Sequence, residues 1–219
     1  MRWTSPQTIS TMRIDRLEPS RRKKGRILAY LADGSILKLT EKEVLEHGLR
    51  AGDELSEEDM DALRASFGES NAKADAAALL GRKPMSRADL TRKLQEKGAS
   101  VRESEYAAEW LEAIGALDDQ AYAALLVRHY SGKGYGPAKW REELRRHGVD
   151  RELWDEAMEE APPTEEIIAV FLQSRWKGRQ PDEKELKRTS DALLRRGFSW
   201  GDVKVALRGV LGLLDEEDF

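Results

Sequence analysis

The sequence predicts a mainly α-helical protein: three tandem three-helix repeats in an elongated, curved array, preceded by a small β-rich (α+β) module at the N-terminus. The first observation is a repeat. Glycines at positions 98, 148 and 197 recur at intervals near fifty residues, each with a leucine four residues before it and a Ser, Asp or Ser two residues after it. Such a period indicates a repeated structural unit. The second observation is Asp33-Gly34 between two apolar runs, which predicts a β-hairpin.

Each repeat glycine is predicted to end a helix and to begin a tight corner. Glycine adopts positive φ without a Cβ clash, so it is the usual residue just past a helix C-terminus. Ser100, Asp150 and Ser199 follow as N-cap residues, because their side-chain oxygens accept hydrogen bonds from the first free amides of the next helix. A further helix opens each unit, roughly over residues 73–80, 119–130 and 165–176.

The chain is predicted to divide into six segments. Residues 12–69 form the N-terminal module, with strands over 12–18, 26–31 and 35–39 and helices that begin after Thr40 and Ser56, the second reaching about Phe67. The three-helix repeats occupy residues 70–117, 118–161 and 162–214. Residues 1–11 form a flexible N-terminus, and residues 215–219 form an acidic tail.

Composition excludes several classes of protein. The 219 residues include no cysteine, which excludes disulfides and thiolate chemistry and is typical of a reducing compartment. No apolar run is long enough to span a membrane, and the N-terminus lacks a signal-peptide core. The net charge of −4 does not mark the whole chain as a nucleic-acid binder. We therefore expect a cytoplasmic protein with no membrane partner.

Charge is distributed unevenly along the repeats. The middle helix of each repeat and its flanking turns are basic, with six basic against two acidic residues in the first two repeats and eight against four in the third. The helices that follow the first two of these are acidic. Two interpretations stay open. Either adjacent helices neutralise each other on a solvated surface, or a basic ridge faces a polyanionic or acidic partner.

Two motifs in the second repeat resemble chemical sites but are better explained as structural features. Adjacent side chains on a helix face different ways, so Asp118 and Asp119 are predicted to cap a helix rather than to act as an acid/base pair. The turn Gly132-x-Gly134-x-Gly136 follows no strand and lacks the Gly-Lys-Ser/Thr ending of a phosphate loop. It is predicted to be a flexible turn with Pro137 in the first helical position.

The aromatic residues are mostly predicted to pack in the core. Three tryptophans lie on apolar stripes, namely Trp110, Trp140 and Trp154. Trp176 and Trp200 lie near turns and are expected to be partly exposed. Tyr130 is assigned to the core, and Tyr135 is left open between core packing and stacking on a nucleic-acid base. The three histidines lie far apart, and their spacing predicts no metal site.

The second repeat carries the most specific pattern in the chain. It opens with Leu117-Asp118-Asp119-x-x-Tyr122-Ala123, continues through a Gly-x-Gly turn before Pro137, and ends at Leu144-x-x-x-Gly148-Val149. In these features, and in the repeat itself, the chain resembles the RecX regulatory proteins over about residues 71–214. The third repeat matches less well, because its opening lacks the Asp-Asp pair. The N-terminal module is similar to that of longer members of the family.

The resemblance implies a regulator without enzymatic activity and without cofactors. Proteins of this family bind the RecA recombinase filament on single-stranded DNA, lie in its helical groove, and typically suppress ATP hydrolysis, filament growth and strand exchange in DNA repair and the SOS response. The implied partner is therefore the RecA filament, with single-stranded DNA contacted through it, and the protein is expected to be a monomer. The alternative is a general DNA-binding helical-repeat module that acts without RecA.

Contact residues are predicted from charge and position alone, since the resemblance supplies no fixed set of binding residues. We expect basic residues in and around the middle helices to meet acidic RecA surface or the DNA backbone. These candidates are Arg92, Lys93, Lys133, Lys139, Arg145, Arg146, Arg195 and Arg196. No residue is predicted to be catalytic, to bind a cofactor or to bind a metal.

Overall fold

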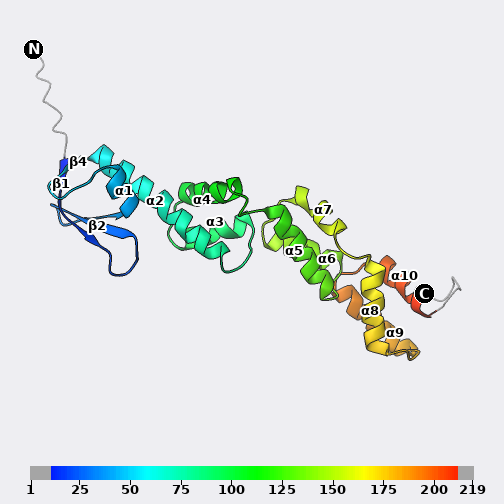
Figure 1. Ribbon diagram of the computed structural model, residues 1–219. Coiled ribbons are helices and arrows are strands. Elements are labelled where there is room, and N and C mark those ends of the chain that lie inside the picture. The colour runs from blue at the N-terminus through cyan, green and yellow to red at the C-terminus, as the bar shows by residue number, and fades with distance from the viewer. Residues whose placement is uncertain (1–10, 212–219) are drawn as a thin grey trace, which may run out of the picture. The chain divides into compact units, whose positions relative to one another are not determined.

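A computed structural model of the chain describes residues 11–211, with only the backbone described at Val210 and Leu211. The described chain is mainly helical with one small antiparallel sheet, as predicted (Figure 1). It divides into two compact units: the described residues up to Leu79 with Thr91–Leu111, and Leu80–Leu90 with the described residues from Glu112 onward. The predicted acidic tail, and residues 1–10 of the predicted flexible N-terminus, lie outside the described residues. Within residues 11–211, no helix is both long and apolar enough to cross a lipid bilayer.

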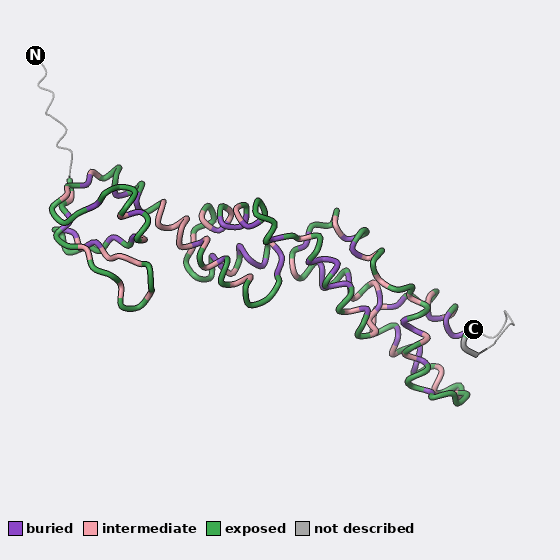
Figure 2. Tube along the Cα trace, in the orientation of Figure 1, coloured by how far each residue is buried: buried purple, intermediate pink, exposed green. Residues whose placement is uncertain are grey.

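The first unit contains a sheet of four strands in the order β3-β2-β1-β4. The strands are β1 Thr11–Pro19, β2 Arg26–Leu31, β3 Ile36–Thr40 and β4 Glu54–Ser56. All pairings are antiparallel, and the predicted hairpin at Asp33-Gly34 joins β2 to β3. Because side chains alternate along a strand, the sheet has one buried and one more exposed face, and burial alternates in this way along β3 and the second half of β2. Figure 2 colours the chain by burial.

The buried face of the sheet packs against the first two helices, α1 Glu41–Glu46 and α2 Glu57–Leu80. The core residues of this module are Ile14, Ala29, Leu31, Leu37, Leu39, Leu49, Leu55, Met60 and Leu63. Thr40 caps α1 as predicted, because its hydroxyl accepts a hydrogen bond from Glu43 N while the Glu43 carboxylate accepts one from Thr40 N.

Helix α2 corrects the prediction of two separate helices, one ending near Phe67 and one beginning near residue 73. Gly68 and Asn71 are weak helix formers, which is why the sequence predicts a break. The helix continues because Ala72 and Ala76 are buried and because Asn71 Oδ1 accepts hydrogen bonds from Lys23 and Arg26, at the turn between β1 and β2. Tertiary contacts thus outweigh local propensity. Strand β4 is a further addition, since three residues are too few to show an alternating pattern.

The repeat helices follow the predicted corners. They are α3 Arg87–Glu96, α4 Val101–Ala113, α5 Asp119–Gly132, α6 Pro137–Arg146, the 3-10 helix η1 Arg151–Leu153, α7 Trp154–Glu159, α8 Thr164–Trp176, α9 Glu183–Arg195 and α10 Trp200–Leu211. Gly98, Gly148 and Gly197 have φ angles of 96°, 66° and 91°, which confirms the left-handed corners. Ser100 and Glu103 form the predicted capping box.

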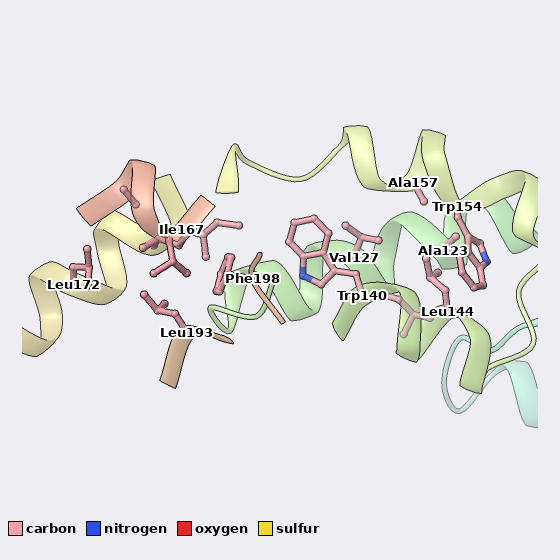
Figure 3. Close-up of a cluster of buried hydrophobic side chains, with 14 of the residues drawn as sticks. Ala123, Val127, Trp140, Leu144, Trp154, Ala157, Ile167, Leu172, Leu193 and Phe198 are labelled. Carbon is pink, nitrogen blue, oxygen red and sulfur yellow. The ribbon is translucent and has the colours of Figure 1, made fainter. Parts of the chain in front are cut away.

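The second unit has one continuous apolar core. Its buried residues come from the α-helices α5 through α10 and from the corners that join them, and Figure 3 shows some of them as one series from Trp154 through Trp140 and Phe198 to Leu172. The core therefore extends across residue 161, the predicted end of the second repeat. Trp140 and Trp154 are buried as predicted, and Trp110, in the first unit, is partly buried.

The other two tryptophans differ from each other. Trp200 is exposed, in line with the prediction. Trp176 is only 4% exposed, which corrects the prediction of partial exposure. It lies at the C-terminus of α8, as the sequence indicates, but there it packs into the core of the second unit.

Candidate binding surface

The second repeat begins at Asp118, which caps α5 as predicted. Asp118 Oδ1 accepts a hydrogen bond from Ala121 N at 2.9 Å. Asp119 Oδ1 accepts instead from Arg87 N at 2.7 Å, at the start of α3. Burial raises the pKa of Asp119, against the opposing effect of the hydrogen bond from Arg87. Each carboxylate thus serves a different helix start, which supports the structural interpretation of this pair.

The corner at Gly148 docks onto the first turn of α3 through polar side chains. Ser86 Oγ donates a hydrogen bond to His147 O and accepts one from Asp89 N at 3.0 Å. His147 Nδ1 lies 2.6 Å from Asp89 Oδ2 and 3.4 Å from Tyr122 Oη. Burial and the negative charge of Asp89 raise the pKa of Tyr122 to about 12. We call this contact the first junction.

The corner at Gly197 docks in a similar way onto the first turn of α6, but through the backbone. Gly136 N donates to Arg196 O at 2.9 Å, and Ala138 N donates to Gly197 O at 3.0 Å. Pro137 is the first residue of α6, as predicted. Two amides at this helix start are therefore occupied, and the glycines allow two backbones to approach closely. We call this contact the second junction.

The side chain of Arg196 bridges the two sides of the second junction. Its guanidinium donates to the carbonyl oxygens of Lys133 and Gly134, both at 3.1 Å. Its Cζ also lies 5.2 Å from the ring centroid of Tyr135 and 4.9 Å from that of Phe171. Tyr135 is partly buried and packs against the core, so its contacts in the structure are those of a packing residue. The structure gives Arg196 a role in joining α9 to the glycine-rich turn.

Lys139 and Arg146 share a buried carboxylate. Glu143 is 2% exposed, Lys139 Nζ lies 2.9 Å from Glu143 Oε1, and the Arg146 guanidinium contacts Glu143 Oε2. Burial by itself raises the pKa of Glu143, but hydrogen bonds from Lys139 and Tyr130 and the charge of Arg146 outweigh it and lower that pKa. Tyr130, which also packs against the core, completes this cluster. Lys139 and Arg146 are therefore paired with a carboxylate of their own helix, α6.

Arg145 differs, because it lies at a small recess lined by three arginines. The recess has a volume of about 260 Å³ and is lined by Arg141, Arg145, Arg151, Trp154 and Asp155. Arg145 Cζ lies 5.8 Å from the ring centroid of Trp154, which is itself buried. Among the described residues, none of the three arginines forms an ion pair with a carboxylate. We call this feature the arginine recess.

Sequence reasoning missed two of the three arginines. Arg141 lies four residues before Arg145 on α6, and this spacing puts both on one helix face, so the signal was present. Arg151 belongs to η1, beyond the corner at Gly148. Its approach to α6 depends on how that corner folds, which no local pattern specifies.

The remaining candidates do not line the arginine recess. Lys133 and Arg195 are exposed, and Lys133 Nζ lies 6.0 Å from the ring centroid of Tyr130. Arg92 and Lys93 lie on the part of α3 that belongs to the first unit, and Arg92 pairs with Glu96 at 3.0 Å. The structure therefore groups only part of the predicted ridge within the second unit.

Comparison with known proteins identifies the family. The family profile described as RecX, second three-helix domain, matches residues 118–158. A regulatory protein RecX from Xanthomonas campestris pv. campestris (strain B100) is 33% identical over 135 residues, which cover 61% of this chain and 83% of that protein. The chain belongs to the RecX family.

Further relatives and solved structures agree with this RecX assignment. A regulatory protein RecX from Pseudomonas putida is 35% identical over 122 residues, which cover 55% of this chain and 78% of that protein. A crystal structure of regulatory protein RecX aligns with a TM-score of 0.65 at 25% identity, covering 89% of this chain and 98% of that one. RecX from Lactobacillus salivarius shares the fold, with a TM-score of 0.59 at 16% identity over 68% of this chain and 99% of that one. The chain is thus related to regulatory proteins, and the resemblance predicted from sequence is confirmed.

Proposed function

We propose that this RecX-family protein regulates the RecA recombinase. In this proposal it binds in the groove of RecA filaments on single-stranded DNA and lowers ATP hydrolysis, filament growth and strand exchange during DNA repair and the SOS response. Membership in a family of regulatory proteins supports the proposal. The structural observation that carries it is the arginine recess, a cationic site that the protein's own carboxylates leave unpaired within the described chain.

The chemistry of the arginine recess suits a polyanionic partner. A guanidinium presents several N–H donors in one plane, so it forms paired hydrogen bonds with phosphate or carboxylate oxygens. Arg141 and Arg145 come from α6 and Arg151 from η1, so three donors converge from two elements on one small volume. Phosphates of filament-bound DNA, or acidic side chains on RecA, fit this arrangement.

The proposal is tested by removing the three charges together. We expect wild-type protein to inhibit RecA-dependent ATP hydrolysis on single-stranded DNA, and the variant Arg141→Gln, Arg145→Gln, Arg151→Gln to need at least about tenfold more protein for the same inhibition. This estimate assumes that one charge-assisted hydrogen bond contributes about 1.5–3 kcal/mol. Filament length measured against added protein reports the same effect without the ATPase reaction.

A matched control separates the recess from bulk charge. The variant Lys42→Gln, Arg102→Gln, Arg128→Gln also removes three positive charges, each from an exposed ion pair elsewhere on the molecule. We expect this control to inhibit RecA like wild type. If the recess variant inhibits as well as the control, the recess is not the contact. If wild-type protein changes neither ATP hydrolysis nor filament assembly at saturating amounts, RecA is not the partner.

A second function is general DNA binding without RecA, and the arginine recess favours it as well, because phosphates of any DNA suit three arginines. Affinity that rests on phosphate contacts falls steeply with salt. A DNA titration of wild-type protein without RecA, repeated over a range of salt concentrations, tests this function. Strong, salt-dependent binding together with an unchanged RecA ATPase would favour it over RecA regulation.

A further inference from the structure

The exposed face of the N-terminal sheet carries a second cationic surface, in the first unit. On β2 and β3, the residues that alternate with the core residues are mostly basic or aromatic. They are Arg26, Leu28, Tyr30, Ile36 and Lys38. A groove of about 640 Å³ lies over these side chains and reaches the loop between β1 and β2, which contributes Arg21 and Arg22.

A second groove of about 570 Å³ adjoins the first. It lies among β3, α2 and the corner between α3 and α4, all within the first unit. The two grooves share Arg26, Ile36 and Lys38, so together they form one continuous surface across the edge of the sheet. The second groove adds Lys23, Arg64 and Lys97 to the basic side chains. We call the combined surface the sheet groove.

Charge in the sheet groove is strongly positive although the chain as a whole is negative. Its lining includes seven basic residues, namely Arg21, Arg22, Lys23, Arg26, Lys38, Arg64 and Lys97, against three acidic ones, namely Glu18, Asp75 and Glu103. The carboxylates are already engaged: Glu18 accepts from Arg16, Glu103 from Ser100 N, and Asp75 from Asn71. Within the described chain, Arg21, Arg22, Lys38 and Lys97 form no ion pair. The local field therefore favours an anionic ligand.

The groove also offers flat surfaces between its cations. Arg16 and Tyr30 pair across β1 and β2, and the Arg16 Cζ lies 3.8 Å from the Tyr30 ring centroid. Arg26 Cζ lies 5.1 Å from the ring centroid of Phe67, while its guanidinium donates to Asn71 Oδ1 at 2.7 Å. Ile36 is 50% exposed and adds an apolar contact between the basic side chains. Rings and guanidinium planes are the surfaces on which unpaired bases stack.

We propose that the sheet groove binds single-stranded nucleic acid directly, with phosphates on the unpaired cations and bases against the Arg16–Tyr30 stack. An acidic protein would use the cations but has no need of the flat surfaces. A duplex has its bases stacked internally, so it gains nothing from them either. The pattern of an antiparallel sheet with cations, an aromatic ring and an adjoining groove fits a flexible strand that follows both grooves. This inference does not depend on RecA.

The test is a titration of a fluorescein-labelled oligothymidine with full-length protein, in the absence of RecA, followed by fluorescence anisotropy. The variant Arg21→Gln, Arg22→Gln, Lys38→Gln removes three cations that form no ion pair in the described chain, so it should fold normally. We expect its affinity to fall at least about tenfold and its salt dependence to weaken by roughly two to three released ions. The control Lys42→Gln, Arg102→Gln, Arg128→Gln is expected to bind like wild type.

Two further measurements make the proposal specific. Tyr30→Ala should lower the affinity for oligothymidine about fivefold or more with little change in salt dependence, whereas Tyr30→Phe, which keeps the ring, should retain wild-type affinity. Melting curves of each variant check that the module is folded. Equal binding by the triple variant and its control would overturn the proposal. It would also be overturned if polyglutamate or duplex DNA displaced the oligothymidine as effectively as unlabelled single strand. The first result would move binding elsewhere, such as to the arginine recess, and the polyglutamate result would indicate an acidic protein partner.

Discussion

The first and second junctions solve one problem with different chemistry. In both, the corner of one repeat docks onto the first turn of a helix about sixty residues earlier in the chain. At the first junction, the corner at Gly148 contacts α3 through the side chains of Ser86, Asp89 and His147. At the second junction, the corner at Gly197 contacts α6 through backbone hydrogen bonds from Gly136 and Ala138. A repeated architecture thus does not require repeated contacts.

The two junctions therefore depend on different kinds of residue. A side-chain contact tolerates substitution at the cost of individual hydrogen bonds, because neighbouring atoms adjust. A backbone contact depends on the absence of a Cβ, since backbone atoms cannot rotate away from an added methyl group. We therefore expect the clash of an added Cβ to be relieved by a smaller neighbouring side chain at the first junction but not at the second.

The largest effect is expected for Gly136→Ala. The added Cβ would lie 2.6 Å from Gly197 O and 2.7 Å from Gly197 C, both backbone atoms. Overpacking of this kind is expected to lower the free energy of unfolding by about 3 kcal/mol. Urea denaturation of the full chain measures this loss. Gly132→Ala is the control in the same turn, because nothing lies within 4 Å of its Cβ position. It should be neutral or stabilising by up to about 1 kcal/mol. Similar losses for both variants would contradict the close-approach argument.

Arg196→Ala is expected to destabilise the second junction by about 2 kcal/mol, because it removes charge-assisted hydrogen bonds to two carbonyl oxygens and two ring contacts. The neighbouring Arg195→Ala removes an exposed side chain and should change the unfolding free energy by less than about 0.5 kcal/mol. The two melting temperatures, measured side by side, check this prediction. Equal stability of the two variants would show that Arg196 is an ordinary surface residue.

A double-mutant cycle compares the two corner glycines. A Cβ at Gly148 would lie 2.6 Å from Ala88 Cβ, so Ala88→Gly should recover about 1.5 kcal/mol of the loss caused by Gly148→Ala. The part that remains reflects positive φ at that position. At Gly197 the nearest atom is Lys139 N at 2.7 Å, and Ala138 Cβ is at 3.4 Å. Ala138→Gly should therefore give almost no recovery for Gly197→Ala. Comparable coupling at both corners would remove the distinction drawn between them.

Ser86→Ala should cost about 1 kcal/mol, the usual value for the loss of an N-cap. The hydroxyl both accepts from Asp89 N and donates to His147 O, so its removal loosens the first junction without adding bulk. Ser86→Thr keeps the hydroxyl and is expected to retain more of the stability than alanine does. Urea denaturation of both variants measures the difference.

The smallest effect concerns pH and Asp119. Burial raises the pKa of this carboxyl in the folded state above its ordinary value of 3.8, so the stability linked to its protonated form is fully present below pH 3.8 and is lost as pH rises through the folded pKa. Asp119→Asn keeps an acceptor for Arg87 N but carries no charge. The stability of Asp119→Asn minus that of wild type should therefore increase with pH above 3.8, by less than about 1 kcal/mol. A difference that falls with pH would show that the charge is stabilising.

Much of the fold could be predicted because its signals are local. Corner glycines, N-cap residues and the Asp33-Gly34 hairpin act within a few residues, and the structure has each where the pattern indicates. The continuity of α2 and the burial of Trp176 could not be predicted, because both depend on contacts with distant elements. Asn71 joins α2 to the turn between β1 and β2, and Trp176 is covered by the core of the second unit.

The binding surface was less predictable than the fold. A sequence shows how many charged residues there are but not which of them form ion pairs. It therefore does not distinguish Arg145 from Lys139 and Arg146, the two residues that the structure pairs with Glu143. Arg151 joins Arg145 only after the corner at Gly148 has folded. The partners of basic residues, rather than their number, separate the arginine recess from the rest of the predicted ridge.

The position of Arg145 beside the ring of a buried tryptophan has a consequence for kinetics. A free arginine side chain loses rotamer entropy when a ligand immobilises it, and this loss weakens binding. Trp154 is anchored in the core that runs from α5 to α10, so the position of Arg145 is already restricted before any encounter. A pre-ordered cation changes how long a complex lasts more than how fast it forms. A change that weakens the packing of Trp154 should therefore shorten the residence time of a complex formed through Arg145, while its association rate stays nearly unchanged.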